Sequence, residues 1–310
     1  MQLPGITTPR WGPLLYLLTT GIENTAVGRD ANRNLTTGNY NVAMGFGAAY
    51  YSTTSNYNVD IGYQARYSAT TGHSNVAIGF RSMYSNSTGH DNTAIGYQAG
   101  YTLTTSTNNV LVGNYTGDAI TTGARHTAVG YAALSAINSG SDSCAFGFQA
   151  LATTTGSQNN AFGRSALEAL TTGIHNVAVG YASISAATTG SYNTAVGNYS
   201  LDAITTSSYS TAMGYGALTT ATSGASNTGV GYSALFGTTT GNSNSAFGES
   251  TLDANTTGSN NNGFGAGALG SNTTGTNNVA IGLNALAANT TSDDNVAVGN
   301  YALAAQTCRS

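Results

Sequence analysis

The sequence predicts an all-β fold, a parallel β-solenoid of seventeen coils with about 17 residues in each coil. The first observation behind this prediction is a glycine that returns every 17 residues, with one step of 16 between Gly147 and Gly163. The second is a short run of β-branched and small residues directly before each glycine. A fixed short period indicates that every unit is one coil of a stack. This glycine ladder consists of Gly28, Gly45, Gly62, Gly79, Gly96, Gly113, Gly130, Gly147, Gly163, Gly180, Gly197, Gly214, Gly231, Gly248, Gly265, Gly282 and Gly299.

Each coil contains one clear candidate strand. We number coil positions from the Gly or Ser that opens a coil, so that Gly38 is position 1 and Gly45 is position 8. Position 5 is chiefly Thr or Val, position 6 is usually Ala, and position 7 is always large and apolar. Such a run is typical of a short β-strand. The position 7 residues are Val27, Met44, Ile61, Ile78, Ile95, Val112, Val129, Phe146, Phe162, Val179, Val196, Met213, Val230, Phe247, Phe264, Ile281 and Val298.

Both faces of this strand lack charge. Side chains alternate along a strand, so positions 5 and 7 face one way and positions 6 and 8 the other. Across positions 5 to 8 of all coils, Asp60 is the only charged residue. A solenoid that stands alone in water carries polar residues on one strand face. We therefore expect the strand to be buried on both sides, with another copy of the chain covering one of them.

The second half of each coil is predicted to be a second short extended segment, closed by a Thr-Thr pair that turns into the next coil. Residues 21–122 form the part with a tyrosine ladder at position 13, expected to stack through Tyr50, Tyr67, Tyr84 and Tyr101. Residues 123–307 form the part with a leucine ladder at position 12. The residue missing between Gly147 and Gly156 is expected to bend the rod or change its twist. The leucine ladder is Leu134, Leu151, Leu167, Ile184, Leu201, Leu218, Leu235, Leu252, Leu269, Leu286 and Leu303.

The two ends of the chain lie outside the repeat. Residues 1–20 are predicted to cap the first coil or to attach it to another structure, and residues 308–310 form a C-terminal tail. The apolar run around Leu14 is short and interrupted by prolines, so we expect neither a signal peptide nor membrane insertion. Cys144 and Cys308 show no pairing pattern, and reduced thiols are expected.

Composition argues against several classes of function. Charged residues make up 6% of the chain, Lys does not occur, and the net charge is -4 at pH 7. Nucleic-acid binding needs clustered Lys and Arg, so no nucleic-acid partner is expected. The four histidines are dispersed, and only His73 and His90 would stack on adjacent coils. We therefore expect no catalytic residue, no cofactor, no metal site and no enzyme activity.

Two periodic side chains leave alternatives open. Asn recurs at position 4, where stacked amides can satisfy one another in a ladder, and a sugar-binding array is the alternative. Aromatic residues recur at position 9, where they either pack between coils and chains or form a strip that binds glycans or proteins. An ice-binding face is disfavoured, because adjacent threonines in a strand point opposite ways. The candidate binding strip is Tyr63, Tyr97, Tyr131, Tyr181, Tyr215 and Tyr232.

The strand motif points to a known kind of repeat. The segments Asn75–Gly79 (Asn-Val-Ala-Ile-Gly), Asn193–Gly197 and Asn295–Gly299 resemble the head repeats of YadA-type trimeric autotransporter adhesins, and similar repeats occur in bacteriophage tail fibres. The resemblance covers residues 21–307. It implies a left-handed parallel β-roll with three chains side by side and the Val, Ile or Phe of each strand at the trimer core. The longer period, and the expected lack of an export signal and an anchored stalk, favour the phage fibre.

The sequence thus leads to three functional hypotheses. The first is a rigid homotrimeric fibre segment in a virion appendage, with a role in host attachment through a surface glycan or protein. The second is the head of a bacterial cell-surface adhesin that binds matrix protein or glycan. The third is the subunit of a self-assembling extracellular filament.

Overall fold

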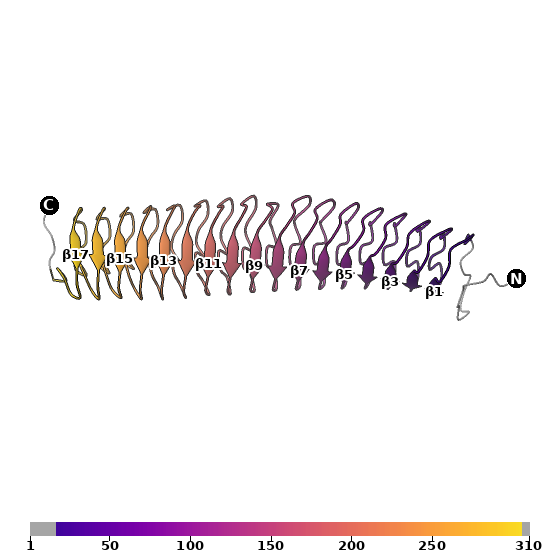
Figure 1. The fold of residues 1–310 in the computed structure, drawn as a ribbon, viewed down its shortest axis with the longest axis horizontal. Coiled ribbons are helices and arrows are strands. Elements are labelled where there is room, and N and C mark those ends of the chain that lie inside the picture. The colour runs from indigo at the N-terminus through magenta and orange to yellow at the C-terminus, as the bar shows by residue number, and fades with distance from the viewer. Residues whose placement is uncertain (1–16, 306–310) are drawn as a thin grey trace. The chain divides into compact units, whose positions relative to one another are not determined.

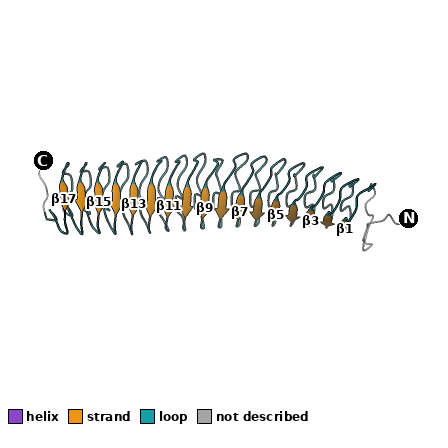
Figure 2. Ribbon diagram, viewed as in Figure 1, coloured by secondary structure: helices purple, strands orange, loops and turns teal. Residues whose placement is uncertain are grey.

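The computed structural model describes residues 17–305 and divides into two compact units, Met1–Gln158 and Asn159–Ser310. The expectations for residues 1–16 and for the tail at residues 308–310 lie outside the described residues. Each coil contributes one three-residue strand, and the described part of the chain contains no helix (Figures 1 and 2). The first unit holds β1 (Thr25–Val27), β2 (Val42–Met44), β3 (Val59–Ile61), β4 (Val76–Ile78), β5 (Thr93–Ile95), β6 (Val110–Val112), β7 (Thr127–Val129) and β8 (Cys144–Phe146). The second holds β9 (Asn160–Phe162), β10 (Val177–Val179), β11 (Thr194–Val196), β12 (Thr211–Met213), β13 (Thr228–Val230), β14 (Ser245–Phe247), β15 (Asn262–Phe264), β16 (Val279–Ile281) and β17 (Val296–Val298).

Within each unit, every strand pairs in parallel with the strand of the next coil. The register follows the repeat spacing, so each strand residue pairs with the residue at the same position of the next coil. Thr25 pairs with Val42, and in the second unit Val177 pairs with Thr194. Figure 1 shows the strands of each unit side by side in chain order. The predicted parallel β-solenoid is therefore confirmed. Identical coils stack in this way because each strand then offers the same side chains to its neighbours on both sides.

The predicted second strand is wrong. Positions 9 to 12 form turns in every coil of the described chain, and residues at positions 10 and 12 have positive φ, as Ala132 (51°) and Leu134 (56°) show. A strand needs extended φ near −120°, so this alternation winds the backbone too tightly for a strand. Hydrogen bonds between coils persist: Ala132 N–H donates to the Asn114 carbonyl, and Leu134 N–H donates to the Ala150 carbonyl, both at 3.0 Å.

The interior of each coil is narrow and filled by few side chains. Ala at position 6 and Leu at position 12 are fully buried in most coils, as in Ala145 and Leu151. Where position 12 is glycine, the core is repacked. A Cβ on Gly117 would lie 2.7 Å from Cδ1 of Ile120 and 2.8 Å from Cδ2 of Leu111, which replaces the usual Ala at position 6. Leu111 thus fills the space that the missing side chain leaves.

Asn at position 4 forms a buried ladder, as favoured from the sequence. Oδ1 of Asn24 accepts the backbone N–H of Asn41 at 3.0 Å and the side-chain Nδ2–H of Asn41, also at 3.0 Å. Nδ2 of Asn24 donates to the Gly38 carbonyl at 2.8 Å. Each amide therefore finds its partners in the neighbouring coil and needs no ligand.

The glycine ladder marks the closest approach between coils. Gly45 has a φ of +132°, which side chains rarely adopt, and an added Cβ would lie 2.5 Å from the carbonyl oxygen of Gly62. The backbones of two coils therefore come close together at this position. Any residue larger than glycine would push two coils apart.

The shortened coil differs from the others in its closing turn. In most coils the opening glycine lies against the opening residue of the next coil, but Gly140 lies beside the Thr155 carbonyl instead. The buried Thr154 hydroxyl accepts the Gly156 N–H at 3.1 Å. The missing residue therefore belongs to this turn, next to the division between the two units. The bend or change of twist expected there stays a prediction.

Candidate functional site

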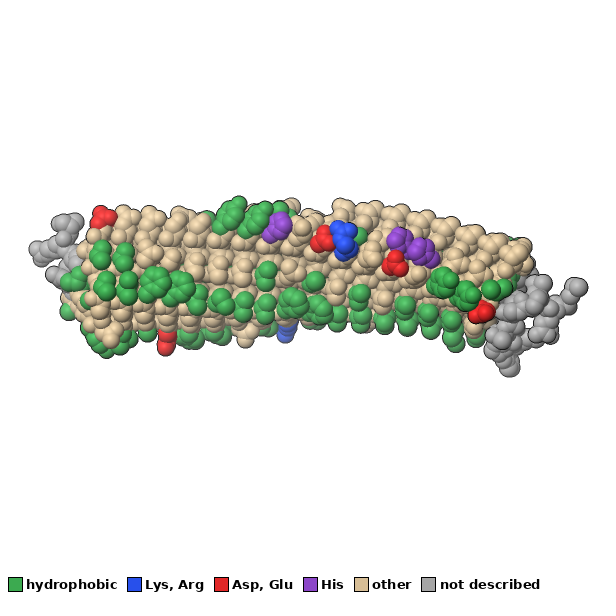
Figure 3. Space-filling model, viewed as in Figure 1, with side chains coloured by type: hydrophobic (Ala, Val, Ile, Leu, Met, Phe, Trp, Pro, Cys, Tyr) green, Lys and Arg blue, Asp and Glu red, His purple; other side chains and the backbone are tan. Residues whose placement is uncertain are grey.

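The outward face of the strands carries an apolar stripe, formed by the position 7 residues named above. These side chains stay accessible within the chain: Met44, Ile95 and Ile281 are 40%, 37% and 43% exposed. Within the chain the strand is buried on one side, because the small position 6 residue fits the narrow interior and position 7 points away from it. The expected cover of the other side by another copy of the chain stays a prediction. Figure 3 shows apolar side chains in rows on the face in view.

In the first unit, the aromatic strip at position 9 is a stacked column. Phe46, Tyr63, Phe80 and Tyr97 stack in order, with ring centroids between 5.0 and 5.3 Å apart. Arg29 lies over the Phe46 ring, 5.6 Å from its centroid. The candidate residue Tyr63 is therefore inside the column, and Tyr97 is at its end.

The column is interrupted where Asn replaces the aromatic residue at position 9. Asn114 accepts the Tyr97 N–H through its Oδ1 at 3.0 Å, and the adjacent Tyr115 meets Tyr97 edge-on at 5.2 Å. Tyr131 meets Tyr115 edge-on at 5.9 Å and stacks on Phe148 at 5.4 Å. Desolvation, followed by the charge and hydrogen bond of the neighbouring Tyr97, raises the pKa of the Tyr115 hydroxyl above its ordinary value.

The second unit repeats this arrangement. Arg164 lies 5.7 Å from the Tyr181 ring centroid, and Tyr199 meets Tyr181 edge-on at 5.2 Å. Tyr215 meets Tyr199 edge-on and stacks on Tyr232 at 5.7 Å. The three candidate residues of this unit thus belong to one aromatic run, and Tyr215 and Tyr232 are 52% and 56% exposed.

The stacking limits what the strip can bind. A ring inside a column has both faces occupied by its neighbours, so it offers its edge to solvent and, for Tyr, its hydroxyl. Binding a sugar by ring stacking requires an open face. The rows are therefore better suited to protein side chains or to another copy of the chain, for which edges and hydroxyls provide amphipathic contact area.

Sequence reasoning missed a second set of exposed aromatic residues, at position 3. Tyr40 and Tyr57 stack at 5.1 Å in the first unit, and His175, Tyr192 and Tyr209 stack in the second. Tyr57 is 62% and Tyr209 65% exposed, more than any residue of the position 9 strip. Their recurrence at one coil position could have revealed this second aromatic row from the sequence. The expected tyrosine ladder at position 13 also stacks, with centroids 5.0 to 5.4 Å apart.

The histidines fall into three environments. His126 replaces Asn in the ladder, is buried, and has both ring nitrogens near backbone groups: Nε2 is 2.7 Å from the Gly140 carbonyl, and Nδ1 accepts the Ser143 N–H at 3.3 Å. His175 is exposed and lies 4.9 Å from the ring of Tyr192. His73 and His90 stack on each other, as the repeat spacing suggests.

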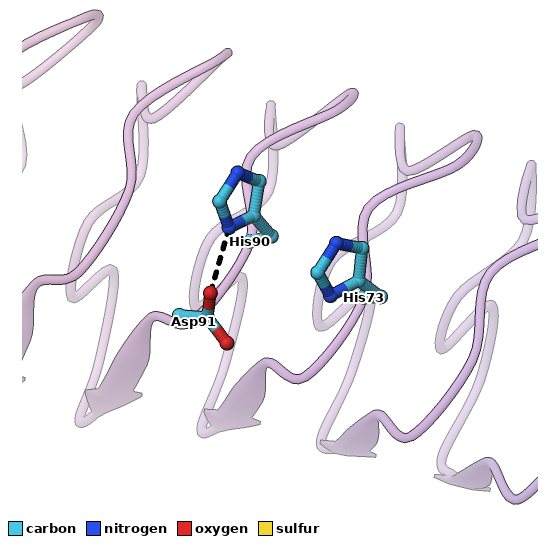
Figure 4. A group of neighbouring side chains, drawn as sticks. All are labelled: His73, His90 and Asp91. Carbon is cyan, nitrogen blue, oxygen red and sulfur yellow. Dashed lines mark hydrogen bonds and ion pairs between the residues drawn. The ribbon is translucent and has the colours of Figure 1, made fainter.

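The described residues contain one group of side chains close enough to hold a metal ion. It consists of His73, His90 and Asp91, whose ligand atoms lie within 4.8 Å of one another (Figure 4). No metal site was expected from the sequence. The sequence did contain a signal for this group: His73 and His90 are one repeat apart, and Asp91 directly follows His90.

No family model matches the chain, and no curated protein matches it either. Within residues 17–305, no helix is long and apolar enough to cross a membrane. The resemblance of the strand motif to adhesin heads and phage fibres therefore bears on function only as a proposal.

Proposed function

We propose that the chain is a structural subunit of a phage tail fibre or a similar virion appendage. In this proposal three copies associate in parallel as a left-handed roll, form a rigid segment and contribute to host attachment. A structural role suits a chain with few charged residues, in which backbone hydrogen bonds join each coil to the next along each unit.

The apolar stripe is the observation that carries this proposal. Large apolar side chains recur at the same position of every strand and are left accessible by the fold. Monomeric soluble proteins rarely expose contiguous apolar surface on this scale. Fully burying an exposed Val, Ile or Phe contributes about 1.5–3 kcal/mol, so covering the part of each side chain that is still exposed would contribute roughly 0.5–1.3 kcal/mol per coil. Identical rows on identical chains match each other under a closed symmetry, so a second and third copy are the simplest cover.

Light scattering on the purified chain tests the assembly. We expect a mass three times that of one chain, and we expect Ile78→Asp with Ile95→Asp to lower it towards the monomer. The matched control is Thr71→Asp with Thr88→Asp, which adds the same charge to the exposed turn residues directly before these two coils and should keep the trimer. A folded wild-type monomer at micromolar concentration would rule the trimer out. Circular dichroism verifies folding, and Ile78→Thr with Ile95→Thr is the milder pair if the aspartates unfold the chain.

An adhesin head is the second candidate, and the exposed aromatic rows favour it. Their edges and hydroxyls suit a protein ligand on a cell or matrix surface. Tyr97→Ala with Tyr131→Ala should weaken attachment of the purified protein to its target cells at least tenfold, whereas Tyr84→Ala in the separate position 13 ladder should not. Full attachment by the double variant would exclude the strip. Electron microscopy of virions with an antibody against the chain separates this candidate from the fibre.

A further inference from the structure

Three potential metal ligands meet at two neighbouring turns of the first unit. His73 lies in the turn before β4, and His90 and Asp91 lie in the turn before β5 (Figure 4). The two imidazole rings are nearly parallel, with centroids 4.7 Å apart and an interplanar angle of 10°. Oδ2 of Asp91 is 2.8 Å from Nδ1 of His90. Two imidazoles and a carboxylate are thus presented together to solvent.

The backbone holds these turns at a fixed separation. The Asp91 N–H donates to the His73 carbonyl at 3.2 Å, so the segments that carry the ligands are hydrogen-bonded to each other. Two residues beyond each histidine, the Asn92 N–H donates to Oδ1 of Asn75 in the buried ladder at 3.1 Å. The group is therefore anchored by the fold, and only the exposed side chains have to adjust around an ion.

We propose that His73, His90 and Asp91 bind a divalent transition-metal cation of the Zn²⁺ type. Neutral imidazole nitrogen and carboxylate oxygen are ligands that Zn²⁺ prefers. Two nitrogens on one tetrahedral zinc are about 3.3 Å apart, so the rings must tilt towards each other by side-chain rotation. The His73 side chain is exposed, and its Nδ1 lies 3.3 Å from the Ser74 hydroxyl, so water can replace that contact.

The proposed site has consequences for the surface. Three protein ligands leave a fourth position for water or for a group of another molecule. An ion there would also link two coils through their side chains. This inference is independent of the assembly and of the host-attachment role proposed above.

The chain provides its own control residue. His175 is exposed like His73, but its ring stacks on Tyr192, and it belongs to no group of metal-ligating side chains among the described residues. Asn is a suitable replacement at the site, because Asn39 and Asn56 occupy the same coil position as His73. Asn39 N–H donates to Oδ1 of Asn56 at 2.8 Å, so an amide at this position supports the coil.

Isothermal titration of the metal-free full chain with ZnCl₂ tests the proposal. We expect one ion per chain, an affinity at least tenfold lower in His73→Asn and in His90→Asn, a smaller loss in Asp91→Asn, and no change in His175→Asn. Equal binding by wild type and the His73→Asn/His90→Asn double variant would overturn the proposal, as would an equal loss in His175→Asn.

A spectroscopic measurement counts the ligands directly. Electron paramagnetic resonance of the chain loaded with one equivalent of Cu²⁺ should show two imidazole nitrogens in wild type and one in His73→Asn. The same single nitrogen in both proteins would contradict a shared site. Thermal unfolding in EDTA should be the same for the double variant and wild type, which shows that the variant is folded.

Discussion

Arg66 and Asp60 form a fully buried ion pair inside a single coil. Nε and Nη2 of Arg66 donate to Oδ1 and Oδ2 of Asp60 at 2.9 and 3.2 Å, and Nη1 donates to the Gly72 carbonyl at 3.3 Å. Asp60 occupies the position that is usually Ala, and Arg66 occupies the position that is Leu in later coils. The two exceptions to the repeat therefore compensate each other.

This ion pair predicts that substitutions of Asp60 and Arg66 have strongly non-additive effects on the free energy of unfolding. Asp60→Ala leaves the arginine buried and unpaired, and we expect a loss of about 3–5 kcal/mol of unfolding free energy. Asp60→Ala with Arg66→Leu restores the residues of the later coils and should return the stability to that of wild type or raise it by about 1–4 kcal/mol. Urea unfolding followed by circular dichroism measures both. A single variant as stable as the double variant would show that the pair is not coupled.

His126 predicts a dependence of stability on pH. Burial is the main cause that lowers its pKa below the ordinary value of 6.5, with Arg125 acting in the same direction and Asp142 and backbone groups of Gly140 and Ser143 opposing. The folded state therefore resists protonation, and the unfolded chain binds the proton more readily. Stability present above about pH 6.5 is lost as the pH falls below it.

The matched variant for this prediction is His126→Asn, which restores the residue of the ladder. Between pH 7.5 and 5, the unfolding midpoint should fall more in wild type than in the variant, which retains the other three histidines. Parallel pH profiles for the two proteins would contradict the assignment.

The glycine ladder predicts a contrast within one coil. Gly45→Ala places a methyl group against the Gly62 carbonyl in the next coil and should lower stability by several kcal/mol, beyond the roughly 1–2 kcal/mol cost of positive φ. Gly47→Ala should cost little more than the roughly 1–2 kcal/mol of positive φ, because its Cβ would meet the Tyr67 side chain at 3.2 Å rather than backbone, and Ala132 adopts the same conformation at the same coil position. Thermal unfolding of the two variants compares them. Equal losses would argue against the close approach as the cause.

The packing of Leu111 over Gly117 predicts that the large side chain can be moved from position 6 to position 12 of this coil. Leu111→Ala should cost about 2–5 kcal/mol because it leaves a cavity, and Gly117→Leu alone should overpack the same space. Together they give Ala at position 6 with Leu at position 12, the combination of Ala128 and Leu134 in the next coil, and most of the stability should return. Denaturant unfolding of the four proteins completes the cycle. Additive losses in the double variant would show that the two side chains do not share one space.

The sequence by itself determined the repeat, the number of coils, the place of the strand and the asparagine ladder. Residues that return at a fixed period in a solenoid lie next to their own copies, so their contacts with one another follow from the spacing alone. The stacking of His73 on His90 and of Tyr50 on Tyr67 also follows from the repeat spacing alone. These features needed no knowledge of how the coil is folded internally.

Only the tertiary structure decided which strand face is the interior and how the second half of the coil runs. Both strand faces are uncharged, so hydrophobicity could not distinguish them. The narrow coil settles the choice by volume, because it accepts Ala43 and excludes Met44. The left-handed backbone of Leu134 has no sequence signal, since leucine normally avoids positive φ. The grouping of Asp91 with His73 likewise depends on how that turn directs its side chains.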